Sequence, residues 1–240
     1  YRENLVRIGM QSIFDGLDDL CDRHLQLDEN WAGREPRYQH PTTLLRLCSE
    51  NPPAADGADL IHALYDRVVH NWNSAGENQA CLPSAENWRF EKRLGFRDDN
   101  QRPEILLERT IALVTDNDNW ANQVPVDSGL LGARPHWMDL VFRAGDRYAF
   151  IELKYESNTP LSAACQVLQY GIVYAFSRSH AELLQLSVET TALLKASEIA
   201  LKVLAPSEFY TRYGKAPDWL AGFESSLNEG LARFCEQSTG

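Results

Sequence analysis

Residues 137–155 constrain the fold more than any other part of the sequence, because they have the pattern of two strands joined by a short turn. Apolar and polar residues alternate over Trp137–Arg143 well enough for a strand, and Arg147–Tyr155 is expected to form its partner. Ala144, Gly145 and Asp146 between them are typical of a hairpin turn. The sequence therefore predicts an antiparallel pair of strands at this point.

The hairpin stands within a series of predicted helices and strands. Pro103 suits the first position of a helix that runs to about Thr115, and Thr159 and Pro160 suit the cap and first residue of a long apolar helix that runs to about Arg178. The other elements expected in this part are a strand at Gln123–Val126, a polar helix around Ala181–Lys195, a strand at Ile199–Leu204, and helices at Pro206–Tyr213 and Asp218–Cys235. This order predicts an α/β fold with a mixed sheet (α+β) and a core of helix, three strands, helix and strand.

The first 80 residues predict a separate helical region that is acidic. Apolar residues recur at three- and four-residue steps over Ile13–Leu25, and further helices are expected at Thr42–Ser49 and Asp59–Asn73. Seven basic and thirteen acidic residues give the region a net charge of −6. We therefore expect an N-terminal helical region over residues 1–80, a connecting segment over 81–102 and an α/β domain over 103–240.

Charge and hydropathy exclude several classes of protein. The 240 residues carry 23 Lys and Arg against 34 Asp and Glu, a net charge of −11. This charge argues against a protein that binds nucleic acid over its whole surface. Residues 130–180 hold five basic and four acidic groups, so a polyanion is acceptable there. The longest apolar stretch, Tyr170–Phe176, is far shorter than the roughly 20 residues of a membrane helix, and no membrane association is expected.

The cysteines favour an intracellular, reducing location. They are odd in number and widely spaced, with no Cys-x-x-Cys pair, and they stand at Cys21, Cys48, Cys81, Cys165 and Cys235. Free thiols are expected from this pattern rather than a disulfide framework or a zinc site. No signal peptide is visible at Tyr1, so the predicted location is the cytoplasm.

Three residues of the hairpin are candidate catalytic residues. Glu152 and Lys154 are two residues apart, so an extended strand places both side chains on one face. Reflection of the hairpin about Gly145 pairs Glu152 with Met138 and leaves Asp139 one residue out of register. A bulge or another turn centre would bring Asp139 opposite Glu152, and the sequence leaves this open.

Carboxylates gathered in this way favour a divalent cation. Like charges in one place destabilise each other and raise carboxylate pKa values, and Glu108 on the preceding helix is a further carboxylate. Asp139, Glu152 and the backbone carbonyl of Leu153 are the hard oxygen ligands that Mg²⁺ prefers. With Lys154 placed to stabilise developing negative charge, the set suits hydrolysis of a phosphodiester bond.

At these residues the chain resembles the PD-(D/E)xK nuclease superfamily. Asp139 followed by Glu152-Leu153-Lys154 is similar to the signature of that family, and residues 103–204 follow its order of helix, three strands, helix and strand. Gln166-Val167-Leu168-Gln169-Tyr170 is similar to the Gln-x-x-x-Tyr motif of the RecB-type branch. Met138 departs from the proline that often stands there. The resemblance covers about 100 residues and implies a restriction-endonuclease-like core.

The resemblance also implies an activity and its site. It implies a Mg²⁺-dependent nuclease in which Mn²⁺ can substitute for Mg²⁺. The expected substrate is nucleic acid, with DNA favoured over RNA. Asp139 and Glu152 would bind the metal with the Leu153 carbonyl, Lys154 would be the catalytic cation, and Gln166 would support the site. Glu108 fits the acidic residue of the first core helix and would be a further catalytic and metal-binding carboxylate, with Glu104 as the second choice. Weaker candidates for contacts to nucleic acid are Tyr170, Arg134 and Arg178.

Two other hypotheses remain open on the sequence. The chain could be a catalytically inactive module of this fold that binds a basic protein partner or nucleic acid, with the acidic helix around Asp15–Asp22 as the contact surface. That region could instead cover the site or dock onto a larger assembly. Tyr170, Trp120 and Trp137 are in any case common core residues, although tryptophan can also stack on bases.

Overall fold

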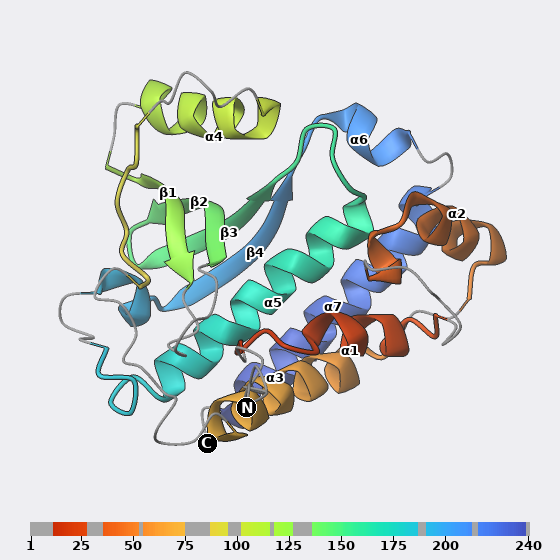
Figure 1. Cartoon of the computed structure of the whole chain (residues 1–240), viewed down its shortest axis with the longest axis horizontal. Helices are drawn as coiled ribbons and strands as arrows, with labels where there is room; N and C mark the ends of the chain where they lie inside the picture. Colours follow the sequence, from red (N-terminus) through yellow and green to blue (C-terminus); the bar gives the residue numbers. More distant parts are fainter. Residues whose placement is uncertain are drawn as a thin grey trace, which may run out of the picture.

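The chain folds into a four-stranded mixed sheet packed between helices (Figure 1). The computed structural model describes residues 12–27, 36–52, 55–74, 87–95, 102–115, 118–126, 136–186, 191–212 and 216–238. Arg134, Cys81 and most of the expected connecting segment lie outside these ranges. Of the helices that the structure describes, none is long and apolar enough to cross a lipid bilayer.

The predicted order of helix, three strands, helix and strand is confirmed. Helix α4 (Pro103–Val114) leads to the strands β1 (Trp120–Val126), β2 (His136–Ala144) and β3 (Arg147–Leu153), then helix α5 (Pro160–Ser179) crosses to β4 (Glu198–Leu204). The sheet order is β1-β2-β3-β4, with antiparallel pairs except for the parallel pair of β3 and β4. The cap of α5 is as expected, because the Thr159 hydroxyl accepts a hydrogen bond from the Ser162 amide at 3.1 Å.

The register of the hairpin answers the question that the sequence left open. Ala144 pairs with Arg147 and Leu140 with Ile151, so the turn consists of Gly145 and Asp146 alone and no bulge is needed. Gly145 has a φ of 70°, which glycine adopts without a steric penalty. The same register continued by one pair sets Asp139 opposite Glu152. The reflection about Gly145 that paired Glu152 with Met138 is therefore wrong.

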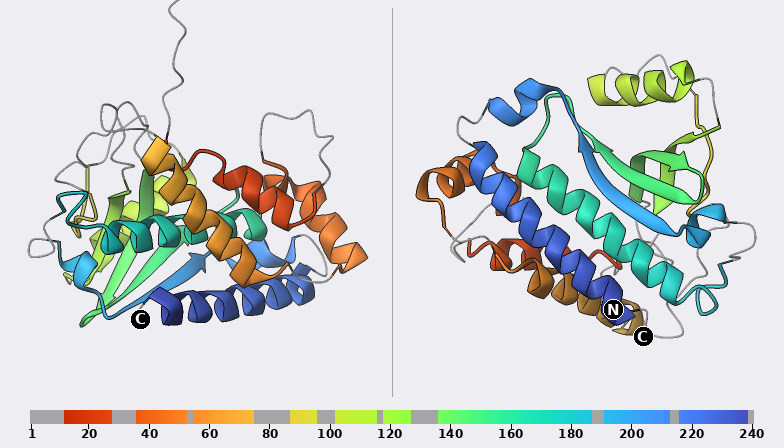
Figure 2. Two further views of the ribbon diagram at one scale, coloured as in Figure 1. Left: turned by 90° about the horizontal axis from the view of Figure 1, so that it is seen from below. Right: turned by 180° about the vertical axis from the view of Figure 1, so that it is seen from behind.

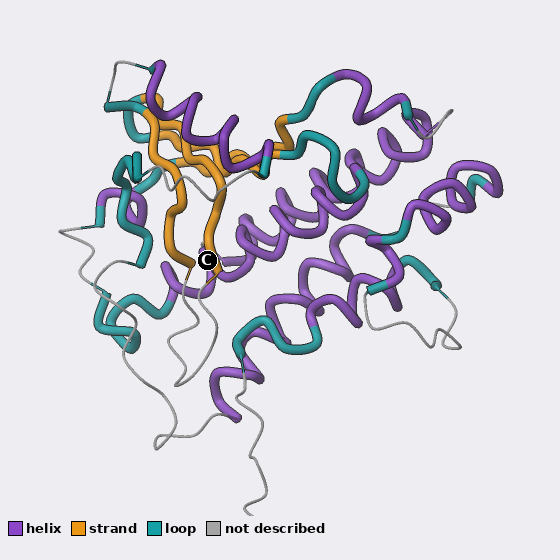
Figure 3. The backbone as a smooth tube through the Cα atoms, turned by 45° about the horizontal axis from the view of Figure 1, so that its top comes forward, coloured by secondary structure: helices purple, strands orange, loops and turns teal. Residues whose placement is uncertain are grey.

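Helices cover the two faces of the sheet unequally. Helix α4 lies on one face, where Leu107 and Ile111 pack on a small cluster formed by Leu140, Ile151 and Leu153. Helix α5 crosses the other face, and 14 of its 20 residues are buried, so it is enclosed rather than amphipathic. Figures 2 and 3 show the sheet beside a layer of long helices, with α5 between the two.

The N-terminal helices belong to the same core as the sheet and α5. Helices α1 (Leu17–His24), α2 (Pro41–Glu50) and α3 (Gly57–Ser74) and the short 3-10 helix η1 (Arg37–Gln39) pack with α5 and the long closing helix α7 (Ala216–Ser238). One continuous cluster of buried residues joins Leu17 and Leu64 to Val141, Phe150 and Phe223. The helices of the first 80 residues are thus packed directly on the α/β part.

The expected polar helix over Ala181–Lys195 is wrong. Residues 181–185 form turns, and the only helix of this stretch in the described residues is the short 3-10 helix η2 (Ala192–Lys195). Tertiary packing explains the difference, because Leu184, Leu193 and Leu194 enter the core and the Tyr174 hydroxyl donates to the Leu193 carbonyl at 2.8 Å. The short helix α6 (Ser207–Thr211) then precedes α7.

Close contact between α3 and α7 depends on glycine, and this gives a stability prediction. A Cβ on Gly230 would lie 2.5 Å from the backbone carbon of Gly57, whereas a Cβ on Gly222 of the same helix would meet nothing within 4 Å. Gly230→Ala should lower the free energy of unfolding by about 2–3 kcal/mol, because the obstructing atoms are backbone. Gly222→Ala, the matched control, should raise it by about 0.5–1 kcal/mol. Urea unfolding measures both, and equal stability of the two variants would contradict the contact.

Candidate active site

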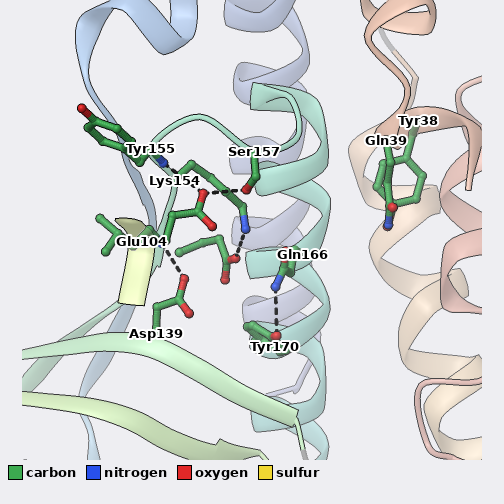
Figure 4. A network of polar contacts seen from close by, with 11 residues as sticks. Tyr38, Gln39, Glu104, Asp139, Lys154, Tyr155, Ser157, Gln166 and Tyr170 are labelled. Atoms are coloured by element: carbon green, nitrogen blue, oxygen red, sulfur yellow. Dashed lines mark hydrogen bonds and ion pairs between the residues drawn. The ribbon is translucent and has the colours of Figure 1, made fainter. Parts of the chain in front are cut away.

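The candidate site lies where β2 begins and β3 ends, near the N-terminus of α5, and Figure 4 shows its polar side chains. One oxygen of Asp139, Oδ2, accepts a hydrogen bond from the Leu153 amide at 2.9 Å. Lys154 Nζ lies 2.6 Å from Glu152 Oε1, and the two side chains form an ion pair. The structure therefore brings together all three residues of the predicted signature.

The ion pair is deeply buried, which changes the proton affinities of the site. Glu152 is fully buried and Lys154 is 6% exposed. Burial, assisted by the charge of Asp139 and opposed by Lys154, raises the pKa of Glu152 to about 8. Burial acts to lower the pKa of Lys154, but the charge of Glu152 and the hydrogen bond to it outweigh burial and raise this pKa. Lys154 is therefore held in its charged form.

Carboxyl groups outnumber the lysine. Burial also raises the pKa of Asp139, and the charge of Glu104 acts in the same direction. The second oxygen of Glu152, Oε2, is buried and receives a hydrogen bond from none of the described residues. A buried carboxylate oxygen without a donor is costly, so the site has an uncompensated acceptor and more carboxyl groups than cations.

Glu104 and Glu108 on α4 take different positions. Glu104 Oε1 accepts hydrogen bonds from the Tyr155 amide at 3.1 Å and from the Ser157 hydroxyl, and its charge acts on Asp139, Glu152 and Lys154. It thereby ties α4 to the segment that follows β3. Glu104, the second choice from the sequence, faces the cluster directly.

Glu108 is buried one turn further along α4 and is held by two amides. Asn122 Nδ2 donates to its Oε1 at 2.7 Å, and Gln123 Nε2 donates to its Oε2. Burial, opposed by the hydrogen bonds from the two amides and assisted by the charge of Asp139, raises the pKa of Glu108 to about 7. Both oxygens of Glu108 are thus occupied, although the carboxyl group is close enough to Asp139 to affect its ionisation.

A local distortion of β1 allows both amides to reach Glu108. Gln123 has a φ of 49°, which is rare for a residue with a side chain. Ala121 and Val124 on either side pack in the larger core, so Asn122 and Gln123 share the opposite face. Sequence reasoning missed these two residues. Two adjacent side-chain amides in a predicted strand, where asparagine is disfavoured, could have indicated that these residues have a special role.

The other predicted site residues divide into those near the cluster and those distant from it. Gln166 Nε2 donates to the Tyr170 hydroxyl at 3.1 Å, and both side chains project from α5 beside the cluster (Figure 4). Burial raises the pKa of Tyr170, with a further contribution from the charge of Glu152. Arg178 lies twelve residues beyond Gln166, about 18 Å along the helix axis, and donates to the Ala196 carbonyl at 2.6 Å. The structure does not bring Arg178 to the site.

The acidic N-terminal helix uses two of its carboxylates inside the fold. Asp18 Oδ1 accepts hydrogen bonds from the Tyr38 hydroxyl and, at 2.8 Å, from Gln169 Nε2. Asp22 accepts the backbone amides of Arg37 and Tyr38, both at 2.8 Å. These contacts fasten α1 and η1 to α5, so these two carboxylates have a structural role that the charge pattern did not predict.

The residues present suit a hard divalent cation. No group of three or more His, Cys, Asp or Glu side chains among the described residues is arranged to hold a metal ion. The predicted metal ligands were the carboxylates of Asp139, Glu152 and Glu108 and the backbone carbonyl of Leu153. Because amides occupy both oxygens of Glu108, two carboxylates and the carbonyl remain available. On an extended strand the amide and carbonyl of one residue point to the same side, so the Leu153 carbonyl faces β2, as its amide does. The buried Oε2 of Glu152 without a donor is what a metal ligand would leave in a metal-free protein.

In comparisons with known proteins, no family model, no curated protein and no solved structure matches the chain.

Proposed function

We propose that the protein is a Mg²⁺-dependent nuclease that hydrolyses phosphodiester bonds of DNA. The observation that carries the proposal is the buried cluster of Asp139, Glu152 and Lys154, with its excess of carboxyl groups over cations and the unoccupied oxygen of Glu152. The mixed sheet and the order of its elements support the resemblance to the restriction-endonuclease-like core and to PD-(D/E)xK nucleases. Fold similarity alone would not establish activity, so the proposal depends on the cluster.

Asp139, Glu152 and the Leu153 carbonyl would hold the cation, either Mg²⁺ or Mn²⁺ in its place. When bound, such an ion polarises a phosphoryl oxygen and lowers the pKa of a coordinated water. The Leu153 amide holds Asp139 in position through its hydrogen bond. Lys154, kept charged by Glu152, is the donor that would stabilise negative charge on the phosphate as the bond breaks.

The surrounding residues orient these groups. Glu104 joins α4 to Tyr155 and Ser157, which fixes the helix over the cluster. Glu108, clamped by two amides, adds negative potential beside Asp139 without needing to contact the metal itself. Gln166 and Tyr170 form a polar wall on α5 that faces the same space.

A cleavage panel tests the proposal. Plasmid, linear duplex, single-stranded DNA and RNA are incubated with the protein in the presence of Mg²⁺, Mn²⁺ or EDTA. We expect cutting of DNA with either metal and none with EDTA, because the hydrolysis needs the cation. Absence of cutting from all substrates by folded protein with metal would contradict the proposal and favour a non-catalytic module of the same fold.

A further inference from the structure

A positively charged segment lies along the outer edge of β1. Within residues 87–95, the Trp88 amide donates to the Pro125 carbonyl at 3.0 Å, and the Glu91 carbonyl accepts the Asn122 amide at 3.3 Å. The segment therefore runs antiparallel to β1. It carries three cations in a chain whose net charge is −11. Arg89 forms an ion pair with Glu91 at 2.5 Å and Lys92 donates to the Thr115 carbonyl, so the net positive charge of the segment comes from Lys92 and Arg93. A polyanion near the candidate site would be attracted to this edge.

Arg93 is fixed with respect to the candidate site by a buried asparagine. Its backbone amide donates to Asn122 Oδ1 at 2.7 Å, and its carbonyl accepts Asn122 Nδ2 at 2.9 Å. Asn122 is fully buried and also donates to Glu108. One side chain therefore links the backbone of Arg93 to the acidic helix over the site.

The guanidinium of Arg93 lies over an aromatic ring next to Asp139. Its central carbon is 4.9 Å from the ring centroid of Trp137. Trp137 and Arg93 are both half-buried, so neither is enclosed in the core. Trp137 precedes Asp139 by two residues on β2, a separation of about 7 Å along a strand.

We infer that Trp137 and Arg93 form a nucleotide subsite that binds one unpaired nucleotide next to the bond that is cut. The inference rests on the proposed function and adds the substrate class, a single-stranded segment. A base reaches the face of an aromatic side chain only when it has left its own stack. Arg93 covers one face of the Trp137 ring, so the base would stack on the other face and set its phosphate toward the cation. The acidic cluster does not supply such contacts, since its groups repel a polyanion until the metal is bound.

Binding of labelled oligonucleotides tests the subsite without cleavage. The parent protein carries Lys154→Ala and contains Mg²⁺, and the probes are a short oligothymidylate and a duplex of equal length, followed by fluorescence anisotropy. Trp137→Ala in this parent should weaken binding of the single strand about 5- to 100-fold, the range for loss of one stacked base. Trp137→Phe should retain most of the affinity. Arg93→Gln should weaken binding and lower the slope of log affinity against log salt by about one.

Trp120→Ala is the matched control. Trp120 lies on the neighbouring strand β1, where its half-buried ring packs on Phe142 with centroids 4.9 Å apart. This variant should bind the oligothymidylate as tightly as the parent. Unchanged affinity in Trp137→Ala, or an equal loss in Trp120→Ala, would overturn the subsite.

Failure of the subsite and failure of the proposed function can be told apart. Metal-dependent cleavage of DNA by the wild type, with a normal KM in Trp137→Ala, would remove the subsite and leave the nuclease. Binding of the single strand that depends on Trp137, in a protein that cuts no substrate, would keep the subsite and remove the nuclease.

Discussion

Replacing Lys154 with alanine is expected to lower the rate of metal-dependent cleavage by about 10³-fold. Lys154 is the cation paired with Glu152 at 2.6 Å, and it is the group placed to stabilise charge on the phosphate. The loss should appear in kcat rather than in KM, because the interaction strengthens in the transition state. Single-turnover cleavage of a DNA substrate measures it.

Folding must be controlled in this variant, since removal of one partner of a buried ion pair destabilises the rest. Circular dichroism and the melting temperature show whether the fold is retained. Lys202→Ala is the matched control, because Lys202 lies on the adjacent strand β4, opposite Ile151, and is exposed. It should cleave at the wild-type rate. Cleavage by folded Lys154→Ala at that same rate would exclude Lys154 from the mechanism.

Asp139→Asn is expected to abolish metal binding while leaving the metal-free fold intact. The amide oxygen can still accept the hydrogen bond from the Leu153 amide, and the substitution removes a charge that raises the pKa of Glu152. Saturating Mg²⁺ should raise the stability of the wild type, by about 2.7 kcal/mol at a hundred times Kd. In Asp139→Asn this gain should disappear, as followed by thermal unfolding with and without metal and by titration calorimetry.

Asp146→Asn provides the comparison for the second prediction. Asp146 is an exposed residue of the turn that joins the same two strands, and its loss changes the net charge equally. This variant should keep the full stabilisation by Mg²⁺. If Asp139→Asn kept it as well, the metal would be bound elsewhere in the chain.

Local rules predicted a large part of the fold. Several features were predictable because they depend on neighbours in sequence. These are the hairpin at residues 137–155, the Thr159 cap and the first positions of α4 and α5. The pairing of Glu152 with Lys154 followed from the two-residue period of a strand. For these features the information lies within a few residues.

Features that depend on distant contacts could not be predicted. The turn centre shifts the register by one residue, and only the packed sheet selects it. The clamp on Glu108 requires the unusual backbone of Gln123. The polar stretch after α5 does not form the expected helix, because this part of the chain packs against the end of α5, where Tyr174 donates to the Leu193 carbonyl. Arg178 lies far from the site because it donates to the Ala196 carbonyl. Metal binding and activity remain predictions for the experiments above.

The contact of α3 with α7 has a consequence for the order in which the protein is made. The apolar faces of the N-terminal helices are covered by residues 216–238, the last segment described. During synthesis these helices therefore emerge from the ribosome well before the helix that buries them. Leu60, Ile61 and Leu64, fully buried in the finished protein, spend that interval exposed. The core around α3 can therefore close only once α7 has been made, and the apolar surface that is uncovered until then favours aggregation.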